Sequence, residues 1–209
     1  MEPDYGQLKN APLADAPYPH AVVRDFLTAR QVAAIAADFP KLPAGGLFMP
    51  EQGTYGPAFG DLLKALEGPA FTAHVGRKLG LDLTGCPTLV TLRDRCTERD
   101  GRIHADAHFK RATALLYIND GWSAPDGRLR ILRSGTDLDD YAAEVPPDGG
   151  VLVVFKVQEN SWHGHKPFIG PRRYVMVNWC TSQIERDREA AKHWMSGKVK
   201  AAKHWMGAA

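Results

Sequence analysis

The spacing of hydrophobic and polar residues differs between the two halves of the chain. Before about residue 88, apolar positions recur every three or four residues, as in Val32, Ile35 and Phe39, which is typical of amphipathic helices. Thr28, followed three residues later by Gln31, predicts a capping box at the start of that helix. The proline-rich stretch 17–23 predicts an extended strand before it, and two more short helices are expected near 60–67 and 70–79.

From about residue 88 onward, short apolar runs alternate with turn signals such as Asn119-Asp-Gly and Pro125-Asp-Gly. The candidate strands are 89–93, 112–118, 129–132, 151–155 and 173–179. Short, regularly spaced strands with few helices between them predict a sandwich or small barrel rather than a parallel βαβ sheet. The Gly- and Pro-rich stretch 41–60 predicts a loop, and residues 43–60 within it are a candidate lid.

The C-terminal end contains a repeat, in which Ala190-Ala-Lys-His-Trp-Met recurs eleven residues later from Ala201. Eleven residues make three helical turns, so residues 185–206 are expected to form a basic amphipathic helix that is weakened at Ser196-Gly197. We expect this helix to pack on its own domain, with a homodimer contact or an anionic surface as alternatives. His193 and His204 are interpreted as residues on the helix surface.

Composition restricts the function classes without choosing among them. The 209 residues fit one domain, and 44% hydrophobic residues, 24% charged residues and a net charge of +2 indicate neither nucleic-acid binding nor membrane attachment. No apolar run approaches the roughly 20 residues that a membrane-spanning helix needs. The first twenty residues lack an apolar secretory segment, and the three widely spaced cysteines favour a reducing, cytoplasmic location.

Three residues form a candidate metal site: His104, Asp106 and His163. Two imidazoles and one carboxylate are the facial triad that binds non-haem Fe(II) and leaves coordination positions open. On a strand, His104 and Asp106 would lie two residues apart on one face. His108 is a weaker alternative partner of Asp106, and His165 is the nearby alternative to His163, interpreted as an outer or surface residue.

The last predicted strand offers a candidate anion site in Arg172-Arg173. Arg173 would share a face with Val175, Val177 and Trp179, and this face is the drier one, so Arg173 is predicted to point inward. A buried arginine needs an anionic partner, and a dicarboxylate bound by its guanidinium would provide one. Tyr117, at the end of an apolar strand, could direct its hydroxyl to the same group.

At this point the order of motifs resembles the prolyl-4-hydroxylase-like branch of the Fe(II)/2-oxoglutarate-dependent dioxygenases. The resemblance covers about residues 88–180 and rests on 101–106, 114–122, 126–132, 161–165 and 173–179. It implies a mainly β (α+β) fold, in which a double-stranded β-helix (jelly-roll) core is flanked by N-terminal helices. The expected division is an oxygenase domain, 1–184, with a helical region over 1–87 and a jelly-roll core over 88–184, followed by a C-terminal helical tail, 185–209.

The same resemblance implies roles for single residues. His104, Asp106 and His163 match the iron ligands. Arg173 and Tyr117 match contacts to the distal carboxylate of 2-oxoglutarate. Leu129 and Val177 match cosubstrate-lining side chains, and Trp179 lies further along the same face, beside the substrate. Apart from the resemblance, Lys110 belongs to the basic residues near His104 and is also expected beside the substrate.

The implied reaction is hydroxylation of an unactivated C–H bond with O2 and 2-oxoglutarate, releasing succinate and CO2. The substrate would be a small molecule such as an amino acid, or a protein residue, and basic residues around the His104 segment could favour an anionic one. The alternative is a cupin-like metal-binding barrel that acts as an isomerase, epimerase or sensor without O2. A barrel without catalytic activity, whose working element is the C-terminal helix, is the third option.

Overall fold

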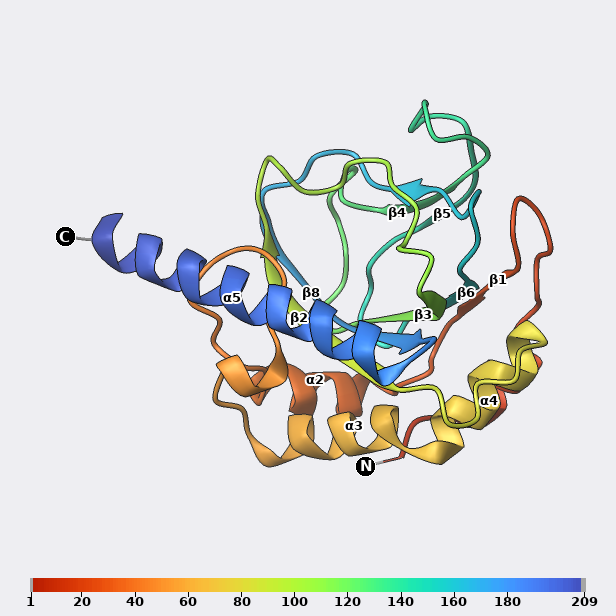
Figure 1. Ribbon diagram of the computed structural model, residues 1–209, viewed down its shortest axis with the longest axis horizontal. Helices are drawn as coiled ribbons and strands as arrows, with labels where there is room; N and C mark the ends of the chain where they lie inside the picture. Colours follow the sequence, from red (N-terminus) through yellow and green to blue (C-terminus); the bar gives the residue numbers. More distant parts are fainter. Residues whose placement is uncertain (1, 208–209) are drawn as a thin grey trace.

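The computed structural model describes the backbone of residues 2–207 and the side chains of residues 2–202. Two antiparallel sheets form the centre of the molecule, and helices cover one face of the larger sheet (Figure 1). The helices are α1 (Tyr5–Asn10), α2 (Ala29–Ala37), η1 (Pro50–Gln52), α3 (Pro57–Glu67), α4 (Pro69–Leu79) and α5 (Gln183–Gly207). The strands are β1 (His20–Val23), β2 (Thr88–Cys96), β3 (Lys110–Tyr117), β4 (Leu129–Leu132), β5 (Tyr141–Val145), β6 (Leu152–Lys156), β7 (His163–Gly164) and β8 (Gly170–Cys180).

The larger sheet has the strand order β1-β6-β3-β8-β2, and the smaller sheet has the order β5-β4-β7. Neighbouring strands that are distant in sequence pair across both sheets, as expected for a jelly roll rather than for a chain of hairpins. The predicted fold class is therefore confirmed: a mainly β jelly-roll core with N-terminal helices and a C-terminal helix.

Two hydrophobic cores lie on opposite faces of the larger sheet. The outer core joins the sheet to the helices and includes Ile35, Leu62, Phe71, Val177 and Trp179. The inner core lies between the two sheets and contains residues from β3, β4, β6 and β8. Because both faces of the larger sheet are buried, its strands are nearly continuous apolar runs, and the sequence pattern marks the strands well but does not distinguish their faces.

The predicted helix start at Thr28 is confirmed. The Thr28 hydroxyl accepts a hydrogen bond from the Gln31 amide, and the Gln31 side chain accepts one from the Thr28 amide. This capping box satisfies two amides at the start of α2, and Val32 and Ile35 then bury one side of the helix.

Several local predictions were wrong. His104 and Asp106 lie in an irregular segment between β2 and β3, where only His104 forms an isolated bridge, so they do not lie on a regular strand. Helix α3 begins at Pro57, three residues earlier than predicted, because proline is well tolerated in the first turn of a helix. The short elements α1, η1, β5 and β7 were missed.

The C-terminal helix α5 begins at Gln183 and continues through the Ser196-Gly197 step. It packs on β2 and β8. A Cβ atom at position 197 would lie 2.4 Å from the Gln52 side-chain nitrogen, so glycine permits a close approach here and does not interrupt the helix.

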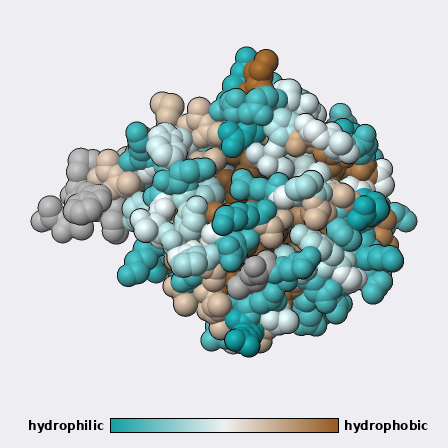
Figure 2. Space-filling model, turned by 90° about the horizontal axis from the view of Figure 1, so that it is seen from below, coloured by the Kyte–Doolittle hydropathy of each residue, from teal (hydrophilic) through white to brown (hydrophobic). Residues whose placement is uncertain are grey.

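The face seen in Figure 2 is largely hydrophilic, with hydrophobic atoms in small separate patches. Among the described residues, none of the helices combines the length and the apolar character that crossing a membrane requires.

Candidate metal and cosubstrate site

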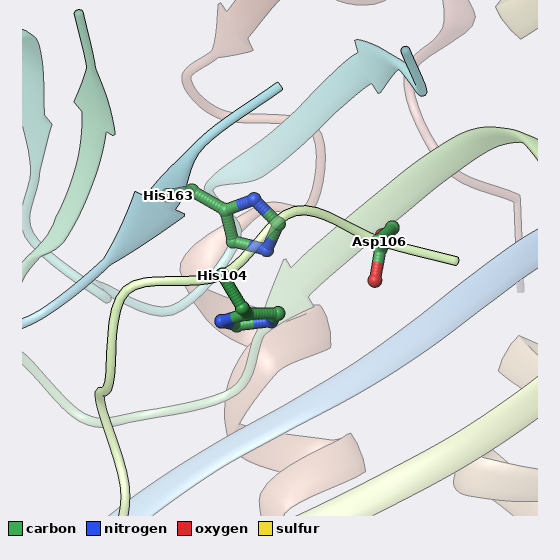
Figure 3. A group of neighbouring side chains, drawn as sticks. All are labelled: His104, Asp106 and His163. Carbon is green, nitrogen blue, oxygen red and sulfur yellow. The ribbon is translucent and has the colours of Figure 1, made fainter. Parts of the chain in front are cut away.

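The structure brings His104, Asp106 and His163 together, although His163 is 57 residues away from Asp106 in the chain. One ligand atom from each residue can be chosen so that all three lie within 4.8 Å of one another (Figure 3). His104 and Asp106 come from the segment before β3, and His163 comes from β7 in the smaller sheet. The backbones of His104 and His163 exchange two hydrogen bonds of 3.0 and 2.9 Å, which hold the two imidazoles side by side.

Each imidazole is oriented by its own backbone. His104 Nδ1 lies 2.9 Å from the Arg102 carbonyl, and His163 Nδ1 lies 2.9 Å from the Ser161 carbonyl. A carbonyl oxygen can only accept a hydrogen bond, so both Nδ1 atoms must carry the hydrogen. The Nε2 lone pairs of both rings are therefore free to bind a metal ion.

Asp106 is held by two side chains of β3. Its Oδ1 atom lies 3.2 Å from the Lys110 ammonium, and its Oδ2 atom accepts a short hydrogen bond from the Thr113 hydroxyl. That hydroxyl accepts a hydrogen bond of 2.8 Å from the Asn178 amide, so its own hydrogen is committed to Asp106. The sequence did not reveal this Asp106–Thr113–Asn178 chain, because its members come from three separate segments.

The protonation states suit metal binding. Burial opposes the charge of Asp106, but Lys110 and His163 outweigh it and lower the pKa of Asp106 to about 2. Burial is also the main cause that lowers the pKa of His163 to about 4, although Asp106 acts in the opposite direction. Near neutral pH the site therefore presents an ionised carboxylate and a neutral His163 imidazole.

A cavity of about 330 Å³ lies beside the triad, at the lower end of the range for small-molecule sites, roughly 300–1,000 Å³. All three triad residues line it. The cavity also reaches residues from β3, β4, β8, α5 and the loop before η1, among them Leu47, Lys110, Leu115, Leu129, Arg172, Tyr174, Met176, Glu189 and His193.

The prediction that Arg173 points inward was wrong. Arg173 is partly exposed, forms an ion pair with Asp94 at 2.7 Å and lies over the Phe39 ring. Arg172 is only 3% exposed and lines the cavity instead. The drier face of β8 is covered by helices, whereas the face toward the cavity carries polar residues, so the drier face was not the one that points to the site.

The surroundings of Arg172 make it a suitable anion-binding group. Its Nε atom donates to the Gly127 carbonyl at 2.7 Å, and one terminal nitrogen lies 3.3 Å from the Tyr117 hydroxyl. The guanidinium stacks near the Tyr117 and Tyr174 rings, and among the residues that the structure describes it forms no ion pair. A buried guanidinium without a carboxylate partner has a strong need for an anion.

The other residues predicted to bind the cosubstrate or the substrate lie on two different faces of the larger sheet. Leu129 lines the cavity, and Tyr117 is fully buried behind it in contact with Arg172. Val177 and Trp179 face the helices, where Trp179 contacts Phe71 and donates a hydrogen bond to Thr72, so their placement beside the cosubstrate and substrate was wrong. Met176, on the same face of β8 as Arg172, lines the cavity in their place.

The alternative histidines differ in position. His108 is exposed and packs against the edge of Phe109, outside the cavity. His165 is buried and lines the cavity near Arg172, and burial, followed by the charge of Arg172, lowers its pKa to about 4. Lys110 lines the cavity, as expected for a residue beside the substrate.

Sequence reasoning missed two pairs of residues that line the cavity. Arg93 donates to the Tyr174 hydroxyl and pairs with Asp100. Glu189 and His193 lie four residues apart on α5, and His193 was wrongly interpreted as a surface residue. The spacing of Glu189, Ala190 and His193 along one side of the helix was the only signal for this contact. His204 lies outside the residues whose side chains are described.

Comparison with known proteins shows what the core of this chain is similar to. Residues 94–181, which hold the triad and Arg172, match the family model described as the 2OG-Fe(II) oxygenase superfamily. The jelly-roll core is thus similar to that superfamily, whose members use Fe(II), 2-oxoglutarate and O2. A comparison with curated protein sequences found no match.

Solved structures support the same fold. A prolyl-4-hydroxylase from Pseudomonas putida is 22% identical with a TM-score of 0.54, and the match covers 85% of this chain and 97% of that one. A viral collagen prolyl hydroxylase from Paramecium bursaria Chlorella virus-1, solved with 2OG, is 12% identical with a TM-score of 0.53, over 78% and 96% of the two chains. A prolyl 4-hydroxylase from Phytophthora capsici is 15% identical with a TM-score of 0.56, over 88% and 68%. The chain thus has the fold of the prolyl-4-hydroxylase-like branch.

The residues present fit the iron and cosubstrate that the superfamily uses. Two free Nε2 lone pairs and one ionised carboxylate lie close enough for a single divalent ion. The adjoining cavity contains a buried guanidinium suited to a carboxylate.

Proposed function

We propose that this protein is an Fe(II)- and 2-oxoglutarate-dependent dioxygenase that hydroxylates an unactivated C–H bond and releases succinate and CO2. In this proposal His104, Asp106 and His163 hold the iron. Arg172, supported by Tyr117, binds the distal carboxylate of 2-oxoglutarate, and Leu129 lines the cosubstrate pocket. Arg172 takes the role that the sequence analysis gave to Arg173.

One observation carries the proposal: the triad and a buried guanidinium that has no carboxylate partner among the described residues line the same cavity. A metal site alone would also suit a cupin-like isomerase or sensor. A separate, buried binding group for a dicarboxylate is what an enzyme with a 2-oxoglutarate cosubstrate requires, and the superfamily match supports the same choice. The intact triad also argues against a barrel without catalytic activity.

The chain's own residues have defined tasks in this reaction. The bound iron, 2-oxoglutarate and O2 together supply the oxidising power that breaks the C–H bond. The Arg102 and Ser161 carbonyls keep the two Nε2 atoms directed at the metal, and Thr113 fixes one oxygen of Asp106. Arg172 neutralises and orients the cosubstrate, and the apolar side chains of Leu115, Leu129 and Met176 exclude water.

The Arg172 guanidinium also explains why the cosubstrate would be a dicarboxylate. Its Nε atom and one terminal nitrogen already have partners, so the remaining hydrogens can meet a carboxylate at the far end of the cavity. The expected charges then balance, because the metal with Asp106 leaves +1, Arg172 adds +1 and 2-oxoglutarate brings −2.

Other aspects of the function stay predictions. We expect a small-molecule or peptide substrate and no nucleic-acid partner. A homodimer through α5 is an alternative that the sequence leaves open, and a cytoplasmic location is expected from the sequence. The three cysteines, Cys86, Cys96 and Cys180, are free thiols, in keeping with a reducing compartment where Fe(II) persists.

The test is an anaerobic titration of the metal-free protein with Fe(II) and then 2-oxoglutarate, followed by visible absorption. We expect a metal-to-ligand charge-transfer band in the wild type. The band should be lost in His163→Ala and kept in the matched control His108→Ala, because His108 lies outside the cavity. A metal-binding protein that shows no such band would favour the cupin-like alternative.

A further inference from the structure

Helix α5 forms one wall of the cavity. It lies outside residues 94–181, the part of the chain that matches the superfamily model. It runs across β2 and β8 in Figure 1. The helix is anchored near its start, where Arg186 Nε donates to the Thr88 carbonyl at 3.2 Å. Ala190 packs against a small core of Met49, Leu89, Phe109 and Cys180. Glu189 and His193 thereby face the cavity.

Further along, α5 contacts the loop before η1. The Gln52 side chain donates to the Trp194 carbonyl at 3.1 Å, and the Lys200 ammonium lies over the Phe48 ring. The neighbouring Leu47 lines the cavity. The helix and this loop therefore close the same side of the cavity together, which favours a small enclosed substrate over an extended chain.

The two ends of the cavity differ in chemistry. Strand β3 begins with Lys110 beside Cys180 and ends with Tyr117 beside Tyr174, so Lys110 and Arg172 lie toward opposite ends. Thr113, which holds Asp106, lies between them. If 2-oxoglutarate extends from the triad to Arg172, the end between Lys110 and α5 remains for the primary substrate.

This end carries one positive and one negative side chain. Lys110 is 7% exposed, and its ammonium has Asp106 as its ion-pair partner. A metal ion bound by Asp106 would repel that ammonium, which then gains from an anionic group of the substrate. Lys110 therefore suits a carboxylate.

The Glu189 carboxylate can bind a further cationic group. Its side chain is 19% exposed, and its ion-pair partner Lys192 is 72% exposed, so solvent screens that pair. Its other neighbour, His193 at 3.4 Å, has a pKa lowered chiefly by burial and is uncharged near neutral pH. An ammonium group in the cavity would give Glu189 a less screened partner.

We infer that the primary substrate is a small zwitterion, a free α-amino acid, whose carboxylate binds Lys110 and whose ammonium binds Glu189. The inference rests on the proposed function, because it places the substrate relative to the iron and the cosubstrate. A cavity of about 330 Å³ that also holds 2-oxoglutarate leaves space for one small molecule. Glu189 is then a specificity-determining residue contributed by the C-terminal helix.

The test starts from the anaerobic complex of the full chain with Fe(II) and 2-oxoglutarate. The twenty free amino acids, their N-acetyl forms and their amides are added in turn, and changes in the charge-transfer band report binding. We expect at least one free amino acid to perturb the band. Its N-acetyl form and its amide should bind about 10- to 100-fold more weakly, since each lacks one charged contact.

Two variants connect this selectivity to the helix. Glu189→Gln should weaken binding of the free amino acid by about 10- to 100-fold and leave its N-acetyl form unaffected. Glu185→Gln is the matched control on the same helix, because Glu185 pairs with the exposed Arg188 and does not line the cavity. The control should bind the amino acid as the wild type does.

The possible failures are distinguishable. Absence of the band in the wild type would contradict the proposed function itself. A normal band that no free amino acid perturbs, or an equal response of Glu189→Gln and wild type, would overturn the zwitterion inference alone. A peptide that perturbs the band when free amino acids do not would overturn it as well.

Discussion

The two faces of β8 carry opposite chemistry within one strand. Arg172, Tyr174 and Met176 face the cavity between the sheets, whereas Val177 and Trp179 pack on the helices. In a sheet covered by helices, the drier face is the structural one, and the face toward the site carries the buried polar groups. A buried arginine on the more polar face of a core strand is therefore the better candidate for ligand binding.

The largest effect is expected on the structural face. Trp179→Ala should lower the free energy of unfolding by about 3–5 kcal/mol, because removal of the fully buried indole leaves a cavity. It also removes the contact with Phe71 and the hydrogen bond to Thr72. Urea unfolding measures this loss. The folded variant should bind 2-oxoglutarate as the wild type does, and a large loss of cosubstrate affinity with little loss of stability would reverse our assignment of the two faces.

Low pH should destabilise the protein through two buried histidines beside the cavity. The pKa values of His163 and His165 are about 4 in the folded protein against an ordinary value of 6.5. Between these values the unfolded chain binds more protons than the folded one. These two rings therefore do not reduce the free energy of unfolding above about pH 6.5. As the pH falls from 6.5 toward 4, the free energy of unfolding decreases.

Each buried histidine can contribute up to roughly 3 kcal/mol to this pH dependence. Urea unfolding of the metal-free protein across this pH range tests the effect. His165→Gln removes one of the two groups and should flatten the dependence. An equally steep dependence in His165→Gln would show that His165 is not buried in its neutral form.

A smaller effect compares two buried threonines. Thr113→Val removes the hydrogen bond to Asp106 and leaves Asn178 without an acceptor, which should cost about 1–3 kcal/mol of stability and about 10- to 100-fold in metal affinity. Thr91→Val is the matched control, because the Thr91 hydroxyl is buried without a partner among the described residues. It should be neutral or stabilising, and Co(II) titration with urea unfolding separates the two variants. Equal metal affinity in both would remove the Asp106–Thr113–Asn178 chain from our account.

Much of the fold was predictable because its signals are local. Apolar runs with turn residues between them located the main strands, and Thr28 with Gln31 located the start of α2. The short strands β5 and β7 were not predictable, since β7 has only two residues and is defined by its pairing partners. The His104 segment was placed on a strand because its two-residue spacing resembles one, yet its position is fixed by the bridge to His163.

The metal ligands of the candidate site were predictable from the sequence, but the residues around them were less so. The residue types at His104, Asp106 and His163 suggested the triad, and the structure brings them together. Arg172 was passed over because the drier face of β8 was taken to face the site, whereas that face is covered by helices, which come from distant parts of the chain. Glu189 joins the cavity only through the packing of α5, a long-range contact that no local pattern encodes.

The most direct test of the account is the affinity for 2-oxoglutarate of two neighbouring variants, Arg172→Ala and Arg173→Ala, measured anaerobically with Fe(II) bound. We predict that Arg172→Ala loses about 30- to 1,000-fold, the cost of removing one partner of a buried charge pair. Arg173→Ala, which removes a partly exposed ion pair with Asp94 and a contact with the Phe39 ring, both outside the cavity, should stay within about 3-fold of the wild type. The opposite result, a large loss in Arg173→Ala with little change in Arg172→Ala, would contradict the assignment of the cavity-facing side of β8.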